Sequence, residues 1–66
     1  MLAHQQRVVD ERDELAGRLE RLSAFIHGPR FADVPDMEQR LLVAQRVHMR
    51  HYLDVLERRI AAWGAA

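Results

Sequence analysis

The chain has 66 residues, none of them cysteine, and its ten basic and ten acidic residues cancel to no net charge. A chain this short forms one domain at most, with a marginal core, and it has neither a disulfide nor a thiolate zinc site to stabilise it. The charge balance argues against binding to duplex nucleic acid or an anionic membrane, and no apolar run approaches membrane-spanning length. We therefore expect association with further copies to supply stability.

The first residues carry no pattern of a secretion signal. The opening sequence MLAHQQRVVDERDE lacks the apolar core of a signal peptide. We expect a cytoplasmic protein.

The first predicted element is a helix over residues 3–26. Its apolar side chains recur at intervals of seven, four, three and four residues, so they share one face of a helix. Arg12 interrupts this stripe, and Glu14 and Arg18 form a favourable pair four residues apart. The stripe consists of Val8, Leu15, Leu19, Leu22 and Ile26.

Residues 27–34 are predicted to form a turn. Gly28 suits the end of the helix because glycine reaches the left-handed conformation without strain. Pro29 has no N–H for a two-bond Schellman cap, so we expect the cap with a single hydrogen bond. Arg30 and Phe31 are the residues of this segment with chemistry beyond that of a connector. A residue such as Phe31 is more often a plug over the open end of the hairpin than a stacking platform, and the residues alone leave both roles open.

The second predicted helix covers residues 35–63. Pro35 suits the first turn, where its missing N–H has no partner to lose. Acidic side chains near this end face the positive end of the helix dipole. A reciprocal cap would join Asp36 with Gln39 or Asp33 with Asp36, and the sequence leaves both pairings open.

This second helix carries more apolar surface than the first helix can cover. Apolar surface left in water is unfavourable by about 25 cal/mol per Å², so we expect the surplus to contact another subunit. The stripe predicted to face the first helix consists of Leu42, Gln45, Met49, Tyr52, Leu56 and Trp63, with Ile60 beside it. A second apolar set consists of Leu41, Val43, Val47, Leu53 and Val55.

The fold class predicted from these patterns is all-α. Residues 1–66 are expected to form a single domain, an antiparallel two-helix hairpin that assembles into a homo-oligomer. The residues expected at the oligomer interface are Leu41, Val47, Leu53, Val55 and Trp63.

Metal binding and catalysis find little support in the side-chain pattern. His48, His51 and Asp54 follow one another at intervals of three residues, but a metal site needs ligands that converge in a pocket, and we expect no metal or cofactor here. Asp10 has carboxylates nearby on the helix surface, yet a hairpin offers no protected cleft for acid–base chemistry. Since Ser23 is the only serine and threonine is absent, the chain is not expected to be an enzyme.

All ten basic residues are arginine, and several are clustered. The planar guanidinium group can clamp a phosphate, and a neighbouring aromatic ring can stack on a base. The alternative is that these arginines pair with Asp and Glu on the surface, and the sequence alone favours this alternative. The residues in question are Arg7, Arg18 and Arg21 on the first helix, Arg30 beside Phe31 in the turn, and Arg46 and Arg50 on the second helix.

Three segments, taken in order, resemble a family of small phage and prophage proteins. The first is RVVDERDELAGRLERLSAFI, the second is RFADVP, and the third is EQRLLVAQRVHMRHYLDVLERRI. Together they are similar to the helical hairpin domain of the phage sponges that counter the CBASS and Thoeris defence systems. The resemblance covers residues 7–60 and is carried by helical core patterns.

The resemblance implies a non-catalytic protein of the host bacterial cytoplasm. Such sponges are small homo-oligomers, commonly hexamers, and hold cyclic di- or trinucleotides, or related TIR-derived signals, intact in pockets between subunits. The chain differs from the family pattern in having little sequence before the first helix and no lysine. The ligand-binding residues expected from charge and position are Arg7, Arg18, Arg21, Arg30 and Phe31.

Two other hypotheses remain from the sequence. One is a structural or adaptor hairpin that oligomerises, or docks on a host protein, without a small ligand. The other is a nucleic-acid binder, which the neutral charge makes the weakest of the three.

Overall fold

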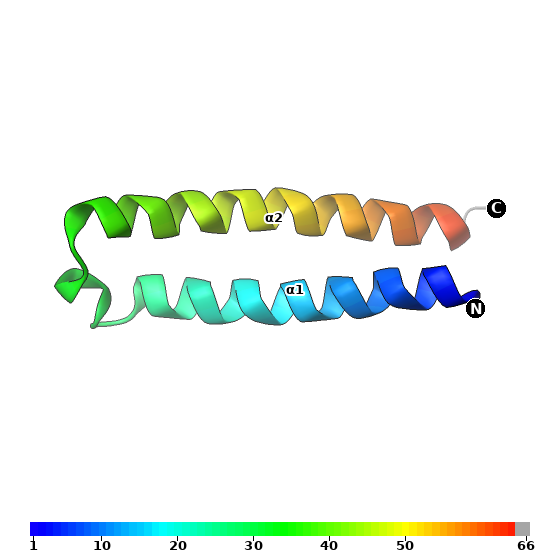
Figure 1. Cartoon of the computed structure of the whole chain (residues 1–66), viewed down its shortest axis with the longest axis horizontal. Coiled ribbons are helices and arrows are strands. Elements are labelled where there is room, and N and C mark those ends of the chain that lie inside the picture. Colours follow the sequence, from blue (N-terminus) through cyan, green and yellow to red (C-terminus); the bar gives the residue numbers. More distant parts are fainter. Residues whose placement is uncertain (65–66) are drawn as a thin grey trace.

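The computed structural model describes residues 1–64 as a hairpin of two long helices (Figure 1). Helix α1 spans Ala3–His27, the short 3-10 helix η1 spans Phe31–Asp33, and helix α2 spans Asp36–Gly64. The start of α1 and the end of α2 lie at the same end of a rod that measures 47 × 15 × 14 Å. The all-α, antiparallel two-helix fold is therefore confirmed. The predicted helices, 3–26 and 35–63, differ from α1 and α2 by one residue at three of their four ends.

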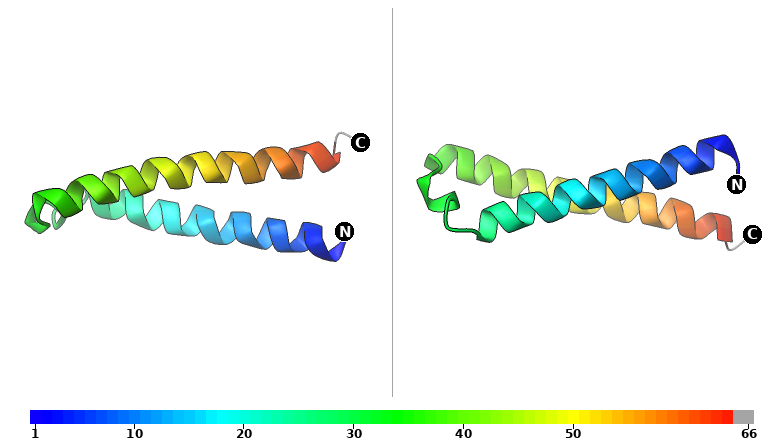
Figure 2. Two further views of the ribbon diagram at one scale, coloured as in Figure 1. Left: turned by 45° about the horizontal axis from the view of Figure 1, so that its top comes forward. Right: turned by 90° about the horizontal axis from the view of Figure 1, so that it is seen from below.

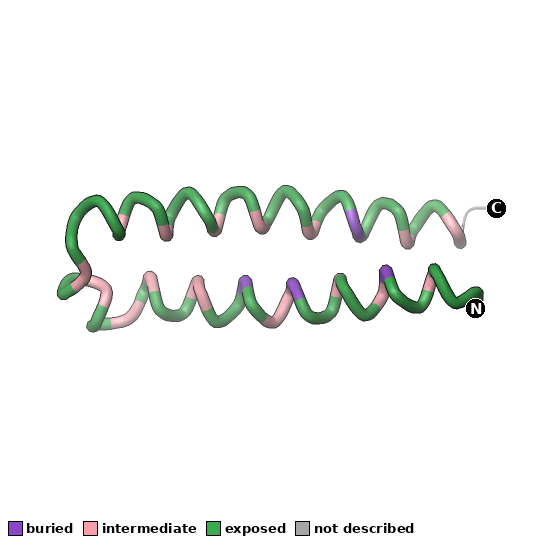
Figure 3. Tube along the Cα trace, viewed as in Figure 1, coloured by how far each residue is buried: buried purple, intermediate pink, exposed green. Residues whose placement is uncertain are grey.

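The two helices lie side by side along their length and cross at an angle, as the views in Figure 2 show. A few buried apolar residues lie along their contact. Figure 3 marks the buried residues where α1 and α2 face one another. Leu56 of α2 is completely buried, and Leu19 of α1 retains only 4% of its exposure. Val8 and Leu15 complete the buried set. The predicted stripe of the first helix is thus the face that α1 packs against α2.

On α2 the contact face differs in part from the predicted stripe. Met49, Leu53, Ile60 and Trp63 pack against the buried cluster. Gln45 and Tyr52, which the sequence placed on this stripe, are exposed. Leu53 lies between Met49 and Leu56 on the helix and comes four residues after one and three before the other, so it shares their face.

The end of α1 corrects one expectation. Gly28 has φ −87° and ψ 171°, which is an extended conformation and not the left-handed one. The reason is Pro29, whose ring restricts the preceding residue to extended backbone. The Gly28 N–H donates to the Phe25 carbonyl oxygen at 3.1 Å. Glycine suits this position for another reason, because a Cβ here would lie 3.1 Å from the Ala24 carbonyl oxygen.

The turn is closed by backbone hydrogen bonds and by the side chain of Gln39. The Val34 N–H donates to the Phe31 carbonyl oxygen at 3.1 Å. The Gln39 amide Nε2 donates to the carbonyl oxygens of Phe31 and Val34, at 3.1 and 2.8 Å. Across residues 1–64, neither of the two reciprocal caps considered above is among the hydrogen bonds.

Helix α2 begins one residue later than predicted. The Gln39 N–H donates to the Pro35 carbonyl oxygen at 2.9 Å, the first hydrogen bond of the helix. Pro35 therefore occupies the N-cap position and Asp36 is the first helical residue. Neither α1 nor α2, over the part of the chain that the structure describes, has a stretch long and apolar enough to cross a membrane.

Candidate functional site

A surface hollow of about 310 Å³ lies beside the turn, where η1 meets the first turns of α2. Its lining is formed by Phe31, Gln39, Arg40 and Val43. We call it the turn hollow. Most of its wall is apolar, and the Arg40 guanidinium is its cationic group.

The Phe31 ring packs against the ring of Phe25, and the Phe31 backbone is hydrogen-bonded to the start of α2. Its centroid lies 6.2 Å from that of Phe25, and the two ring planes are almost perpendicular, at 89°. This edge-to-face arrangement is one of the favoured geometries of aromatic pairs. The Phe31 carbonyl oxygen is fixed by the Gln39 side chain. Phe31 is half-buried, so it packs against the hairpin and still lines the hollow.

Arg40 gives the turn hollow its charge. Its side chain is exposed, and within residues 1–64 none of the ion pairs includes it. A guanidinium free of carboxylates can form two parallel hydrogen bonds with a phosphate or carboxylate. With the Phe31 ring nearby, the hollow offers stacking surface and an anion contact together, which suits a nucleotide.

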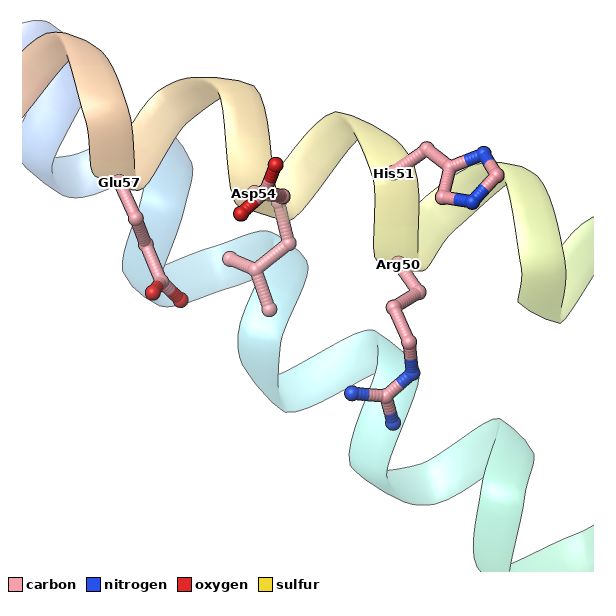
Figure 4. A pocket seen from close by; sticks show the side chains of 5 residues that line it. Arg50, His51, Asp54 and Glu57 are labelled. Atoms are coloured by element: carbon pink, nitrogen blue, oxygen red, sulfur yellow. The ribbon is translucent and has the colours of Figure 1, made fainter.

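A second hollow, of about 340 Å³, lies along the middle of α2 (Figure 4). Arg50 and Glu57 extend from α2 toward α1, whereas His51 lies on the side away from it. Asp54 also lines the hollow and forms an ion pair with Arg58 at 2.9 Å. Two carboxylates beside one arginine repel a phosphate, so this hollow suits an anionic ligand less well than the turn hollow.

The structure separates the predicted ligand-binding arginines. Arg30 and Phe31 lie in the turn, but the rise of about 1.5 Å per residue puts Arg7 about 30 Å from it along α1. Arg18 forms an ion pair with Glu14, with its Nη2 2.5 Å from the carboxylate. The Arg21 guanidinium lies over Gly17, where a Cβ would be 3.3 Å from its Nη1. A single chain therefore does not bring the five predicted residues into one site.

Of the four residues that line the turn hollow, only Phe31 was among the predicted ligand-binding residues. Gln39 and Arg40 lie in the first turns of α2, next to the residues that η1 brings back onto the helix. A polar pair just after a predicted helix start, opposite an aromatic residue of the turn, was the signal that could have found them. Among residues 1–64 there is no group of three or more His, Cys, Asp or Glu side chains that could hold a metal ion.

The predicted interface residues fall into two groups. Leu41, Val47 and Val55 are exposed, at 56%, 45% and 51% of their full surface. Leu53 and Trp63 are half-buried against the core that α1 and α2 share. The first group is the part of the predicted interface that the hairpin leaves uncovered.

Comparison with known proteins gives one relative and one family. The chain is 43% identical over 61 residues to an uncharacterized 7.5 kDa protein encoded in the denB-rIIB intergenic region of Enterobacteria phage T4. That match covers 92% of this chain and 95% of the phage protein. No solved structure matches the chain. Residues 2–62, which include both helices almost completely, match the Sequestin family. This chain therefore belongs to the Sequestin family.

Proposed function

We propose that this protein is a phage-encoded, non-catalytic sponge that binds a cyclic oligonucleotide, or a related nucleotide immune signal, and keeps it intact. Sequestration withholds the signal from the host effector and so blocks an anti-phage defence of the CBASS or Thoeris kind. The family's name describes sequestration, and the relative from phage T4 supports a phage origin. The protein then acts in the host bacterial cytoplasm, where such signals are made.

The observation that carries the proposal is that Phe31 and Arg40 both line the turn hollow. A nucleotide presents a flat base and an anionic phosphate. The ring offers stacking surface to the first, and the guanidinium offers a two-pronged hydrogen bond to the second. Arg30 lies beside Phe31 in the chain and adds a second cation at this end of the hairpin.

The size of the turn hollow favours a site completed by another copy. Small-molecule sites have volumes of roughly 300–1,000 Å³ and enclose most of their ligand. The turn hollow, at about 310 Å³, is at the lower end of that range. A homo-oligomer, such as a hexamer, could enclose the ligand between subunits and bring Arg7, Arg18 or Arg21 of one chain to the turn of another.

The test is isothermal titration of the purified protein with a panel of cyclic di- and trinucleotides and TIR-derived signals. Each ligand is then recovered and analysed by chromatography. We expect tight binding of at least one member, full recovery of the intact ligand, and a fixed ratio of ligand to subunit. No heat from any member, with the oligomer verified in the same sample, would contradict the proposal.

An adaptor function is the alternative, and the exposed apolar face of α2 favours it. Leu41 and Val55 are more than half exposed on a helix that already packs against α1 by another face. A structural hairpin would use this face to bind itself or a host protein without any small ligand. This alternative predicts that no member of the nucleotide panel binds. It also predicts that a pull-down returns one host protein in stoichiometric amount.

A further inference from the structure

Helix α2 carries a second face that is built for helix packing. Beginning at Met37, residues recur at intervals of four and three, the spacing that keeps positions on one seam of a coiled coil. All of them are exposed, and Figure 3 shows the side of α2 turned away from α1 as exposed along its length. We call this face the outer seam. Its members are Met37, Leu41, Ala44, His48, His51 and Val55.

The outer seam is separate from the face that holds the hairpin together. Met49, Leu53 and Ile60 are among the residues of α2 that pack toward α1, and none of them belongs to the seam. Within residues 1–64, Met37, Leu41 and Val55 remain among the most exposed large apolar side chains. A seam of this length left in water is unfavourable, and such exposed apolar faces mark contact sites.

Charge along α2 favours a second copy in the antiparallel orientation. The first turn of the helix is acidic, with Asp36 and Glu38, whereas Arg59 lies toward the other end. Arg58 is already paired with Asp54 in its own helix, which leaves Arg59 for a contact outside the chain. Antiparallel packing brings the acidic start of one helix to Arg59 of the other and opposes the two helix dipoles. Parallel packing would place like charges together.

We propose that two copies of this chain pair through their outer seams, α2 against α2 and antiparallel. In this register Leu41 of one copy faces Val55 of the other, and Glu38 comes close to Arg59. His48 lies on the two-fold axis and faces its own counterpart. The interface is isologous, so each copy offers the same surface. The seam holds two polar residues, His48 and His51, and polar residues at seam positions help to fix one register.

The inference concerns one interface of the assembly in the proposed function, and it does not depend on the ligand. The α1 helices lie outside the pair, and the two turns lie at opposite ends. Each turn hollow then lies near the second half of the partner's α2.

Single cysteines test the register directly, because the natural chain has none. Leu41→Cys and Val55→Cys proteins are prepared separately and treated with a short bismaleimide crosslinker, first alone and then mixed, with no nucleotide present. We expect the mixture to give several-fold more crosslinked dimer than either variant alone. Ala61→Cys, exposed on the same helix but off the outer seam, is the control.

Crosslinking of each variant mainly to itself would indicate parallel packing and overturn the proposal. Yields no higher than those of Ala61→Cys, or a monomer by sedimentation velocity, would also overturn it. Because no nucleotide is present, these outcomes are distinct from failure of the nucleotide panel.

A charge pair gives a second measurement on the intact chain. Leu41→Lys and Val55→Glu are each expected to weaken dimerisation in sedimentation experiments. The double variant is expected to restore it, because each lysine then faces a glutamate of the other copy. A double variant weaker than both single variants would contradict the antiparallel register.

Discussion

The phenol oxygen of Tyr52 donates a hydrogen bond to the Glu11 carboxylate, and this contact joins the two helices near the middle of the hairpin. Within residues 1–64 it is the one hydrogen bond between a side chain of α1 and a side chain of α2. Both side chains are exposed. The contact therefore fixes how the helices are aligned along the rod more than it adds to their stability.

Replacing Tyr52 by phenylalanine is expected to lower the free energy of unfolding by about 0.5–1 kcal/mol, because one exposed hydrogen bond is lost and the ring is kept. Urea denaturation followed by circular dichroism measures the change. Glu20→Gln, an exposed change elsewhere on α1, is the control and should leave the midpoint unchanged. An equal midpoint for both variants would show that water replaces the Tyr52 contact without loss.

Leu56→Ala is expected to have the largest effect of any single apolar truncation. Leu56 is completely buried, and leucine-to-alanine changes in such positions destabilise proteins by about 2–5 kcal/mol. In a chain with so small a core, this loss should leave much of the protein unfolded at room temperature. Thermal melting followed by circular dichroism is the measurement, and the exposed neighbour Glu57→Ala is the control. A sharp transition at the melting temperature of the unmodified protein would contradict the buried position of Leu56.

Gly17, inside α1, and Gly28, just after its last residue, should respond in opposite directions to alanine. Gly17→Ala is expected to stabilise the protein by about 0.5–1 kcal/mol, because alanine is the better helix former. Its new Cβ would lie 3.3 Å from the Arg21 Nη1, the end of a flexible side chain that can move.

Gly28→Ala is expected to destabilise by about 1 kcal/mol, because its Cβ would lie 3.1 Å from the Ala24 carbonyl oxygen, which is backbone and cannot move freely. Melting temperatures of the two variants, measured side by side, give the sign of each effect. Stabilisation by both would mean that the turn relaxes without difficulty.

Gln39→Ala is expected to loosen the turn. The change removes the donor that fixes the carbonyl oxygens of Phe31 and Val34, at a loss of about 1 kcal/mol for a net hydrogen bond. Hydrogen–deuterium exchange should become faster around η1 and stay unchanged in the middle of both helices. Gln45→Ala is the matched control, since the Gln45 side chain has only a weak contact with the Met49 sulfur at 3.8 Å. Equal exchange in the two variants would assign no role to Gln39.

Arg40→Ala tests the turn hollow as the ligand site, once the titration panel has given a ligand. Loss of a charged hydrogen bond to phosphate should weaken binding by about tenfold or more, which corresponds to about 1.4 kcal/mol. Arg50→Ala, which changes the other hollow, should leave the dissociation constant unchanged. If Arg50→Ala weakened binding and Arg40→Ala did not, the ligand site would lie at the hollow in the middle of α2.

The sequence predicted the face of α1 correctly because Val8, Leu15 and Leu19 repeat with helical spacing and lie on one side whatever they pack against. It was less accurate for α2, which has apolar residues on more than one face. Tyr52 and Leu53 are neighbours in the chain, and only the direction from which α1 approaches decides that Leu53 is packed and Tyr52 exposed.

The turn shows a second limit of sequence reasoning. Arg30 and Phe31 stand out in the sequence as the residues with chemistry in a connector. The part played by Gln39 and Arg40 depends on η1 folding back onto the start of α2, which the residue pattern does not specify. Gly28 was placed correctly at the helix end, but the restriction that Pro29 imposes on its backbone outweighs the preference of glycine for the left-handed region.

The hairpin has a practical consequence for experiments on living cells. Helix α1 begins and α2 ends at one end of a 47 Å rod, and the turn hollow lies at the other. A fluorescent label or surface tether attached at the start of α1 is thus held far from the turn of the same chain. A label placed there does not cover the turn hollow of its own chain, which stays accessible to small molecules while the protein is immobilised or imaged.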